Sequence, residues 1–178
     1  MRLSIGRHSI AGAVLVAALG ACSPALNWRT LPLGSLRFTL PCKPDQAQRE
    51  VVLAGVNRML EMRGCEADGA LFAISRIVVG PAEDADALVQ AWRAAALAAL
   101  QSPPGKAEEV TPPNYRGLPG ARAAAWLHAQ GRDPRGSEVQ AQLGWLVSGR
   151  EVFHLAVYGP HLVPATVAPM MTGIDQPK

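Results

Sequence analysis

The sequence has 178 residues, of which 49% are hydrophobic, and its formal net charge is +3. This length and apolar content suit one domain with a hydrophobic core, whereas two domains would be crowded. Lysine and arginine residues are spaced singly along the chain and form no cluster. Their spacing argues against a nucleic-acid-binding groove, which needs a concentrated basic surface.

The N-terminal segment has the layout of an export signal. Arg2 and Arg7 precede an uncharged apolar run from Ile10 to Leu19, and a cationic start followed by such a run is typical of a secretory signal peptide. The run is shorter than the roughly 20 residues of a membrane-spanning helix. It closes with Leu19-Gly20-Ala21-Cys22, which resembles the bacterial lipobox at all four positions.

The lipobox resemblance implies that residues 1–21 are removed and that Cys22 becomes the first mature residue, with two acyl chains on its sulfur and usually a third on its amine. At about 0.8 kcal/mol per buried methylene, these chains hold a protein at a membrane without a spanning helix. An uncleaved signal anchor is the alternative. By the same resemblance, Ser23 after the cysteine mildly favours the outer over the inner membrane. We therefore expect a lipid-anchored protein of the bacterial cell envelope that faces the periplasm.

Loss of Arg2 and Arg7 with the leader lowers the formal net charge to +1. If Cys22 is acylated, Cys42 and Cys65 remain as a pair. In an exported protein, an even remainder indicates one disulfide. Two free buried thiols, or a metal site with two further ligands close by, are the rival interpretations.

The first half of the chain predicts an antiparallel meander after a tether at 22–34. Alternating apolar residues, or short β-branched runs, indicate strands over 36–40, 50–54, 59–65 and 70–79. Asp68-Gly69 supplies the residue types of a tight hairpin turn. One domain is expected to span 35–174, with a tail at 175–178.

The second half begins with an alanine-rich stretch, 81–101, whose acidic start and broad apolar face predict a helix lying on the sheet. Residues 106–120 are rich in proline, glycine and charge and predict a mobile loop. The next stretch, 121–130, is also alanine-rich, but we predict a strand because it is short and ends at Gly131.

A β-hairpin is predicted for 139–147 and 152–158, where apolar residues alternate on both sides of Ser148-Gly149-Arg150. Residues 163–171 predict a closing helix with Pro164 in its first turn. The final stretch, 173–178, is either a frayed tail or a last edge strand.

This element order, together with Leu40-Pro41-Cys42-Lys43-Pro44, resembles the PsbP-type fold of the extrinsic photosystem II subunit and of a small Ran-binding protein. The resemblance covers roughly 28–171. It implies an α+β protein in which helices flank an antiparallel sheet in an α/β/α sandwich. Known users of that fold are mostly binding or assembly proteins, so the resemblance implies no reaction.

Catalytic and metal-binding signals are weak. His128 lies near Asp133 and Ser137, which supplies the residue types of a nucleophilic triad, but such groupings arise by chance and the chain has no Gly-x-Ser-x-Gly motif. His154 and His161 have no compact metal-ligand spacing. We therefore expect no cofactor, no metal and no enzymatic activity.

Tyr115 and Arg116 are candidate partner-binding residues, because an aromatic and a guanidinium in a mobile loop suit an interface. The alternative is a tyrosine folded back onto its own domain. The sequence thus predicts a membrane-anchored, non-enzymatic binding or assembly module of the envelope, with an envelope protein as a candidate partner. An envelope hydrolase using His128, or a purely structural protein held by an uncleaved signal anchor, are the alternatives.

Overall fold

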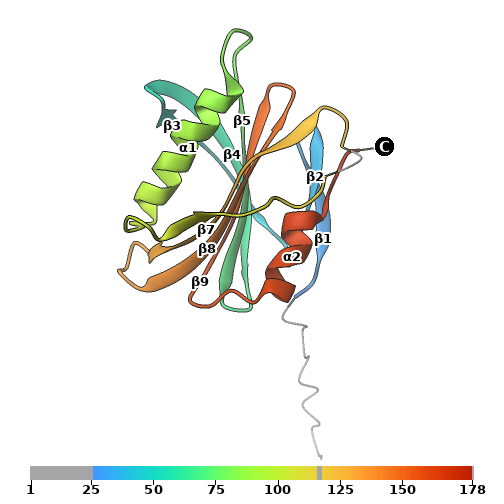
Figure 1. The fold of residues 1–178 in the computed structure, drawn as a ribbon. Helices are drawn as coiled ribbons and strands as arrows, with labels where there is room; N and C mark the ends of the chain where they lie inside the picture. The colour runs from blue at the N-terminus through green and yellow to red at the C-terminus, as the bar shows by residue number, and fades with distance from the viewer. Residues whose placement is uncertain (1–25, 116–117, 178) are drawn as a thin grey trace, which may run out of the picture.

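The structure is a computed structural model and describes residues 26–115 and 118–177. Within them, strands account for 51% of the residues and helices for 16%. The strands form two antiparallel sheets, one of three strands and one of seven (Figure 1). The expected lipidation residue, Cys22, lies outside the described residues.

The large sheet has the strand order β3-β4-β5-β9-β8-β7-β6. Its strands are β3 (Asp45–Leu53), β4 (Val56–Ala67), β5 (Ala70–Val78), β6 (Ala107–Glu109), β7 (Ala121–Arg132), β8 (Glu138–Ser148) and β9 (Glu151–Gly159). The hairpin of β8 and β9 is the one that the alternation predicts. The turn between β4 and β5 contains Asp68 and Gly69, both with positive φ, as expected from this dipeptide.

The small sheet brings together both ends of the described chain. It consists of β1 (Arg29–Leu33), β2 (Leu36–Leu40) and β10 (Ile174–Asp175), with β2 in the centre. The range expected as a tether, 22–34, therefore contains a strand of the fold. Of the two options for residues 173–178, the structure has the edge strand.

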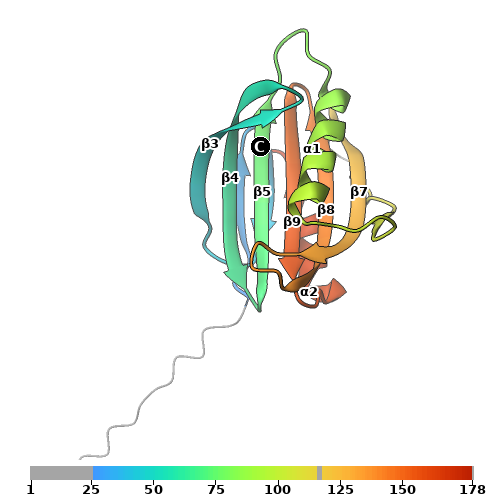
Figure 2. The same ribbon diagram turned by 90° about the vertical axis from the view of Figure 1, so that its left-hand side faces the viewer.

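One face of the large sheet is covered by α1 (Ala85–Ala99), which contacts β3, β7 and β9 and passes in front of β8 and β9 in Figure 2. The helix begins after Asp84, whose carboxylate accepts a hydrogen bond from the backbone N–H of Asp86 at 2.8 Å. It buries Leu88, Val89 and Trp92. These side chains pack on apolar residues of the sheet, among them Leu127, Leu143, Trp145 and Val152.

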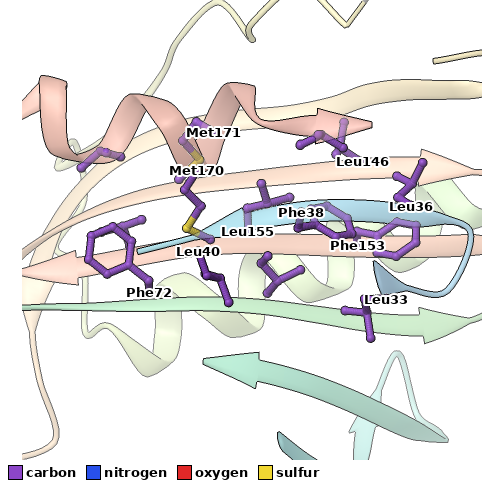
Figure 3. Packing of buried hydrophobic residues seen from close by; sticks show 14 of the residues in the cluster. Leu33, Leu36, Phe38, Leu40, Phe72, Leu146, Phe153, Leu155, Met170 and Met171 are labelled. Atoms are coloured by element: carbon purple, nitrogen blue, oxygen red, sulfur yellow. The ribbon is translucent and has the colours of Figure 1, made fainter. Parts of the chain in front are cut away.

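The opposite face is covered by the small sheet and by α2 (Pro164–Thr172), which begins with proline as expected. Figure 3 shows the packing between these layers, where the rings of Phe38 and Phe153 lie 5.2 Å apart. Met170 and Met171 close this core from the helix side. In the described part of the chain, no helix is both long enough and apolar enough to cross a bilayer.

The expectation of an α/β/α sandwich is wrong. Only one face of the large sheet is covered by a helix alone, because the other face is covered mainly by a second sheet to which α2 adds nine residues. The prediction failed at β2: the alternation of Leu36, Phe38 and Leu40 identifies a strand but not the sheet that it joins. The meander contains β3, β4 and β5 but not β2.

The prediction of a strand at 121–130 is confirmed, since β7 spans Ala121–Arg132 despite its alanine-rich sequence. The prediction of a fully irregular loop at 106–120 is wrong, because β6 pairs with β7 at the edge of the large sheet. The segment Ala-Glu-Glu of β6 is short and poor in residues that favour strands, so the sequence gives no signal for it.

A disulfide joins Cys42, just after β2, to Cys65 on β4, with their Cα atoms 6.0 Å apart. The pairing expected from the cysteine count is therefore present. Because β2 belongs to the small sheet and β4 to the large one, the bond ties the two layers together covalently.

Candidate functional site

A groove of about 450 Å³ lies on the face of the large sheet opposite α1, between the strands β6, β7 and β8 and the start of α2. Six polar side chains line its sheet side: Lys106, Glu108, His128, Gln130, Gln140 and Gln142. Leu162, Pro164 and Val167 form the wall toward α2. A second hollow of about 390 Å³ shares Lys106, Gln130 and Gln140 with this groove and extends it toward the β7–β8 turn.

The strand register explains why these polar side chains meet. Side chains alternate between the two faces of a strand, so the buried Leu127 and Ala129 face α1 while His128 and Gln130 face the groove. His128 is paired with Glu108 on β6 and with Gln142 on β8. In the same way Gln130 is paired with Gln140.

One cross-strand row connects the groove with the core. The register aligns one residue from each of six neighbouring strands: Cys65, Phe72, Val157, Gln142, His128 and Glu108. Phe72 and Val157 belong to the core under the small sheet. Trp28, near the start of the described chain, packs edge-on against Phe72 with ring centroids 6.4 Å apart. The groove therefore lies at the level of the sheet where the chain enters the fold.

Most polar groups of the groove have unused hydrogen-bonding capacity. The Oε1 atom of Gln140 accepts a hydrogen bond from the backbone N–H of Leu162 at 3.0 Å. Within residues 26–115 and 118–177, the other five polar side chains make no hydrogen bond or ion pair. By contrast, Glu109 on the same strand forms an ion pair with Arg93 of α1 at 2.6 Å.

The three residues of the candidate triad are not brought together. Asp133 lies in the turn after β7, where its Oδ1 accepts hydrogen bonds from the backbone N–H groups of Arg135 and Ser137 at 2.9 and 2.8 Å. At about 3.3 Å per strand residue, His128 lies about 16 Å away along β7. His128 therefore faces the groove without the acid and the nucleophile that a triad needs.

His154 is a core residue on the α1 face of β9, with 6% of its surface exposed. Its ring stacks on Trp145 with centroids 4.4 Å apart and lies 5.3 Å from the ring of Trp92. Burial lowers the pKa of His154 to about 3, so its imidazole is neutral near pH 7. Its Nε2 and the Nε1 of Trp145 are buried atoms with no hydrogen-bond partner in the described part of the protein.

His161 is exposed in the connection between β9 and α2 and does not accompany His154. In residues 26–115 and 118–177, no group of three or more histidine, cysteine, aspartate or glutamate side chains is placed to hold a metal ion. The histidines of this region therefore form no shared metal centre.

Tyr115, one of the two candidate partner-binding residues, contacts its own domain. Its hydroxyl donates a 2.5 Å hydrogen bond to the backbone carbonyl of Met171 in α2, and its ring lies 5.6 Å from that of Trp126. Burial raises the pKa of the tyrosine hydroxyl. Tyr115 thus holds the segment after β6 against α2. Arg116, the second candidate, lies outside the described residues.

These features define a β-rich protein with two antiparallel sheets and an open polar groove at one end of the larger sheet. No protein-family model matches the sequence, and no curated protein matches it. Among solved structures, the chain is similar to PA94 from Pseudomonas aeruginosa, a protein of unknown function, with 17% identity and a TM-score of 0.35. The match covers 79% of this chain and 86% of the other chain.

Sequence reasoning missed the groove, although part of its signal was visible. Gln140 and Gln142 occupy alternate positions of a predicted strand, and His128 and Gln130 do the same on the preceding one. Pairing those two strands across the turn at 133–137 places the four polar residues on one face. The contributions of Lys106 and Glu108 depend on β6, which the sequence does not indicate.

Proposed function

We propose that this protein is a membrane-anchored, non-enzymatic binding module of the bacterial cell envelope, lipidated on Cys22 and facing the periplasm, with the polar groove as its binding site. The anchor rests on Leu19-Gly20-Ala21-Cys22 and on the export signal that precedes it. Ser23 favours anchoring in the outer membrane. An envelope component that presents the ligand of the groove is the expected partner.

The observation that carries the binding function is the set of unpaired polar side chains in the groove. Five of them have neither hydrogen-bond nor ion-pair partners among the described residues, so a ligand can replace their water without breaking internal hydrogen bonds. The volume of about 450 Å³ falls in the range of small-molecule sites. No serine, threonine or cysteine side chain accompanies His128 among the described residues that line the groove.

The disulfide supports an exported location, since disulfides persist in oxidising compartments such as the periplasm. The bond between Cys42 and Cys65 leaves no unpaired cysteine among residues 26–115 and 118–177. The thiol of Cys22 is then the third cysteine of the sequence and serves as the acylation site in this proposal.

The test is mass spectrometry of the protein extracted in detergent from its native membrane. Under denaturing conditions we expect a chain that begins at Cys22 and carries two or three acyl chains. Under native conditions we expect a non-covalent adduct that is lost in a Gln142→Trp variant, which fills the groove. Gln48→Trp, on the exposed strand β3, is the matched control and should keep the adduct.

Different results would contradict the lipid anchor and the binding site. A chain that begins at Met1 without acyl groups would overturn the lipid anchor. Absence of any adduct, or an adduct that Gln142→Trp and Gln48→Trp retain equally, would overturn the groove as the binding site.

A further inference from the structure

The charges of the groove are of opposite sign and share one strand. Lys106 directly precedes β6 and Glu108 lies within it, and both side chains face the groove. They are two residues apart, so their Cα atoms lie about 6.6 Å from each other. Both residues are exposed, and neither forms an ion pair in the described part of the chain.

This arrangement selects against ligands with charge of one sign. A polyanion that contacts Lys106 would be repelled by Glu108. A polycation that contacts Glu108 would be repelled by Lys106. The neighbouring Gln130 and Gln142 are uncharged and offer both donors and acceptors. The groove is therefore complementary to a small ligand that carries one cationic and one anionic group a short distance apart.

The apolar wall adds a second requirement. Leu162 and Pro164 line the groove opposite the polar strands, and Val163 between them is 45% exposed. A purely polar zwitterion would leave this wall without a partner. A ligand that joins a zwitterionic group to an apolar part satisfies both walls.

The position of the groove points to the membrane as the source of such a ligand, and this step rests on the proposed lipid anchor. Three strand spacings separate Phe72 from His128 in the cross-strand row, which amounts to about 14 Å. Trp28 packs on Phe72, and the six residues from Cys22 to Trp28 span at most about 21 Å. A bilayer that holds the acylated cysteine is thus within reach of the groove.

We propose that the groove binds the phosphoethanolamine headgroup of a membrane lipid. Lys106 contacts the phosphate, Glu108 accepts hydrogen bonds from the primary ammonium, and the glutamine amides bind the ester oxygens. Leu162 and Pro164, which line the groove, contact the apolar part of the lipid nearest the headgroup. Recognition requires no covalent step.

The first experiment measures binding of soluble headgroup analogues to the full chain in detergent by calorimetry. Glycerophosphoethanolamine should bind at least about tenfold more tightly than glycerophosphocholine, because a quaternary ammonium has no N–H to donate to Glu108 and a charge-assisted hydrogen bond is lost. Glycerophosphoglycerol, which carries only the negative charge, should also bind more weakly. Equal binding of all three analogues would overturn the proposal.

Variants separate the two charged contacts. Glu108→Gln should weaken binding of glycerophosphoethanolamine about tenfold and that of glycerophosphocholine less, because the quaternary ammonium loses only the charge attraction and no hydrogen bond, whereas Lys106→Gln should weaken both equally. The matched controls are Glu109→Gln, on the same strand but ion-paired with Arg93, and Lys43→Gln, an exposed lysine near the disulfide. Control variants that weaken binding as much as the groove variants would contradict the assignment.

The source of the headgroup is tested in vesicles. Full chain reconstituted in phosphatidylcholine vesicles should bind soluble glycerophosphoethanolamine, and vesicles that also contain phosphatidylethanolamine should suppress that binding by occupying the groove. Undiminished binding in both vesicle types would overturn the lipid source. A native adduct that depends on Gln142 but is not displaced by glycerophosphoethanolamine would refute the ligand class and leave the binding function intact.

Discussion

The two faces of the large sheet are built from the same strands but are used differently. On the α1 face, apolar side chains continue from β3 to β7, and the helix covers them with Leu88, Val89 and Trp92. On the opposite face, the small sheet and α2 cover the apolar part, which includes Trp126 of β7 and Leu146 of β8, whereas the end around His128 and Gln142 is polar and open. Residues next to each other in one strand therefore face the buried core on one side of the sheet and the proposed binding groove on the other.

The largest expected effect comes from breaking the α1 face. Trp145→Ala removes a fully buried ring from β8 and should lower the free energy of unfolding by about 4 kcal/mol, because the lost packing leaves a cavity. Gln142→Ala, three residues earlier on the same strand but facing the groove, should change it by about 0.5 kcal/mol or less. Urea unfolding followed by far-ultraviolet circular dichroism measures both. Similar losses in the two variants would contradict the division of labour between the faces.

Removal of the disulfide between Cys42 and Cys65 should give the next largest loss of stability. Replacing Cys42 and Cys65 together by serine should lower the free energy of unfolding by about 3 kcal/mol, as expected for a loop with a sequence separation of 23 residues. Urea unfolding with and without a reductant measures the effect. The reductant should destabilise the wild type and leave the double variant unchanged. A wild type insensitive to reduction would mean that the disulfide does not hold the small sheet in place.

The third prediction concerns the acid response of the α1 face. The pKa of His154 is about 3 in the fold and about 6.5 in an unfolded chain. Its contribution to stability is therefore present above pH 6.5 and is lost as the pH falls toward 3, with about 2 kcal/mol lost at pH 5.

His154→Phe keeps a ring between Trp92 and Trp145 but cannot titrate. The free energy of unfolding of the wild type should therefore fall relative to that of this variant between pH 6.5 and 5. A constant difference between the two proteins over this range would show that His154 is not buried as a neutral imidazole.

The smallest effect is expected where the segment after β6 meets α2. Tyr115→Phe removes the hydrogen bond to the Met171 carbonyl and should lower the free energy of unfolding by about 1 kcal/mol. Chemical unfolding compares the variant with Tyr158→Phe, a tyrosine at the end of β9 with no side-chain hydrogen bond among the described residues. Equal losses of unfolding free energy in the two variants would show that the hydrogen bond of Tyr115 does not stabilise the fold.

Local patterns in the sequence predict most individual elements but not their assembly. The acidic start and apolar face of 85–99 are enough to predict α1, and alternation is enough for the hairpin of β8 and β9. The partner of β2 is not predictable in this way, because β10, one of its neighbours, lies more than 130 residues away in the sequence. Sheet membership depends on such distant contacts.

The groove depends on the same kind of information. His128 and Gln142 carry no local signal for binding, and they become a site only when β7 and β8 pair in the observed register. Glu108 joins them through a three-residue edge strand with an unfavourable strand composition. The disulfide was predictable because the cysteine count and the predicted export signal limit the alternatives to a few.

The most direct test of the account uses glutamine side chains as internal probes. Nuclear magnetic resonance of the full chain in detergent reports the side-chain amides of Gln130, Gln140 and Gln142 in the groove, and those of Gln48 and Gln90 on exposed surfaces elsewhere. On addition of a lipid and small-molecule extract of the envelope, we expect shifts of the three groove signals and constant positions for the other two. Constant groove signals, or shifts of similar size at all five side chains, would contradict the groove as the binding site.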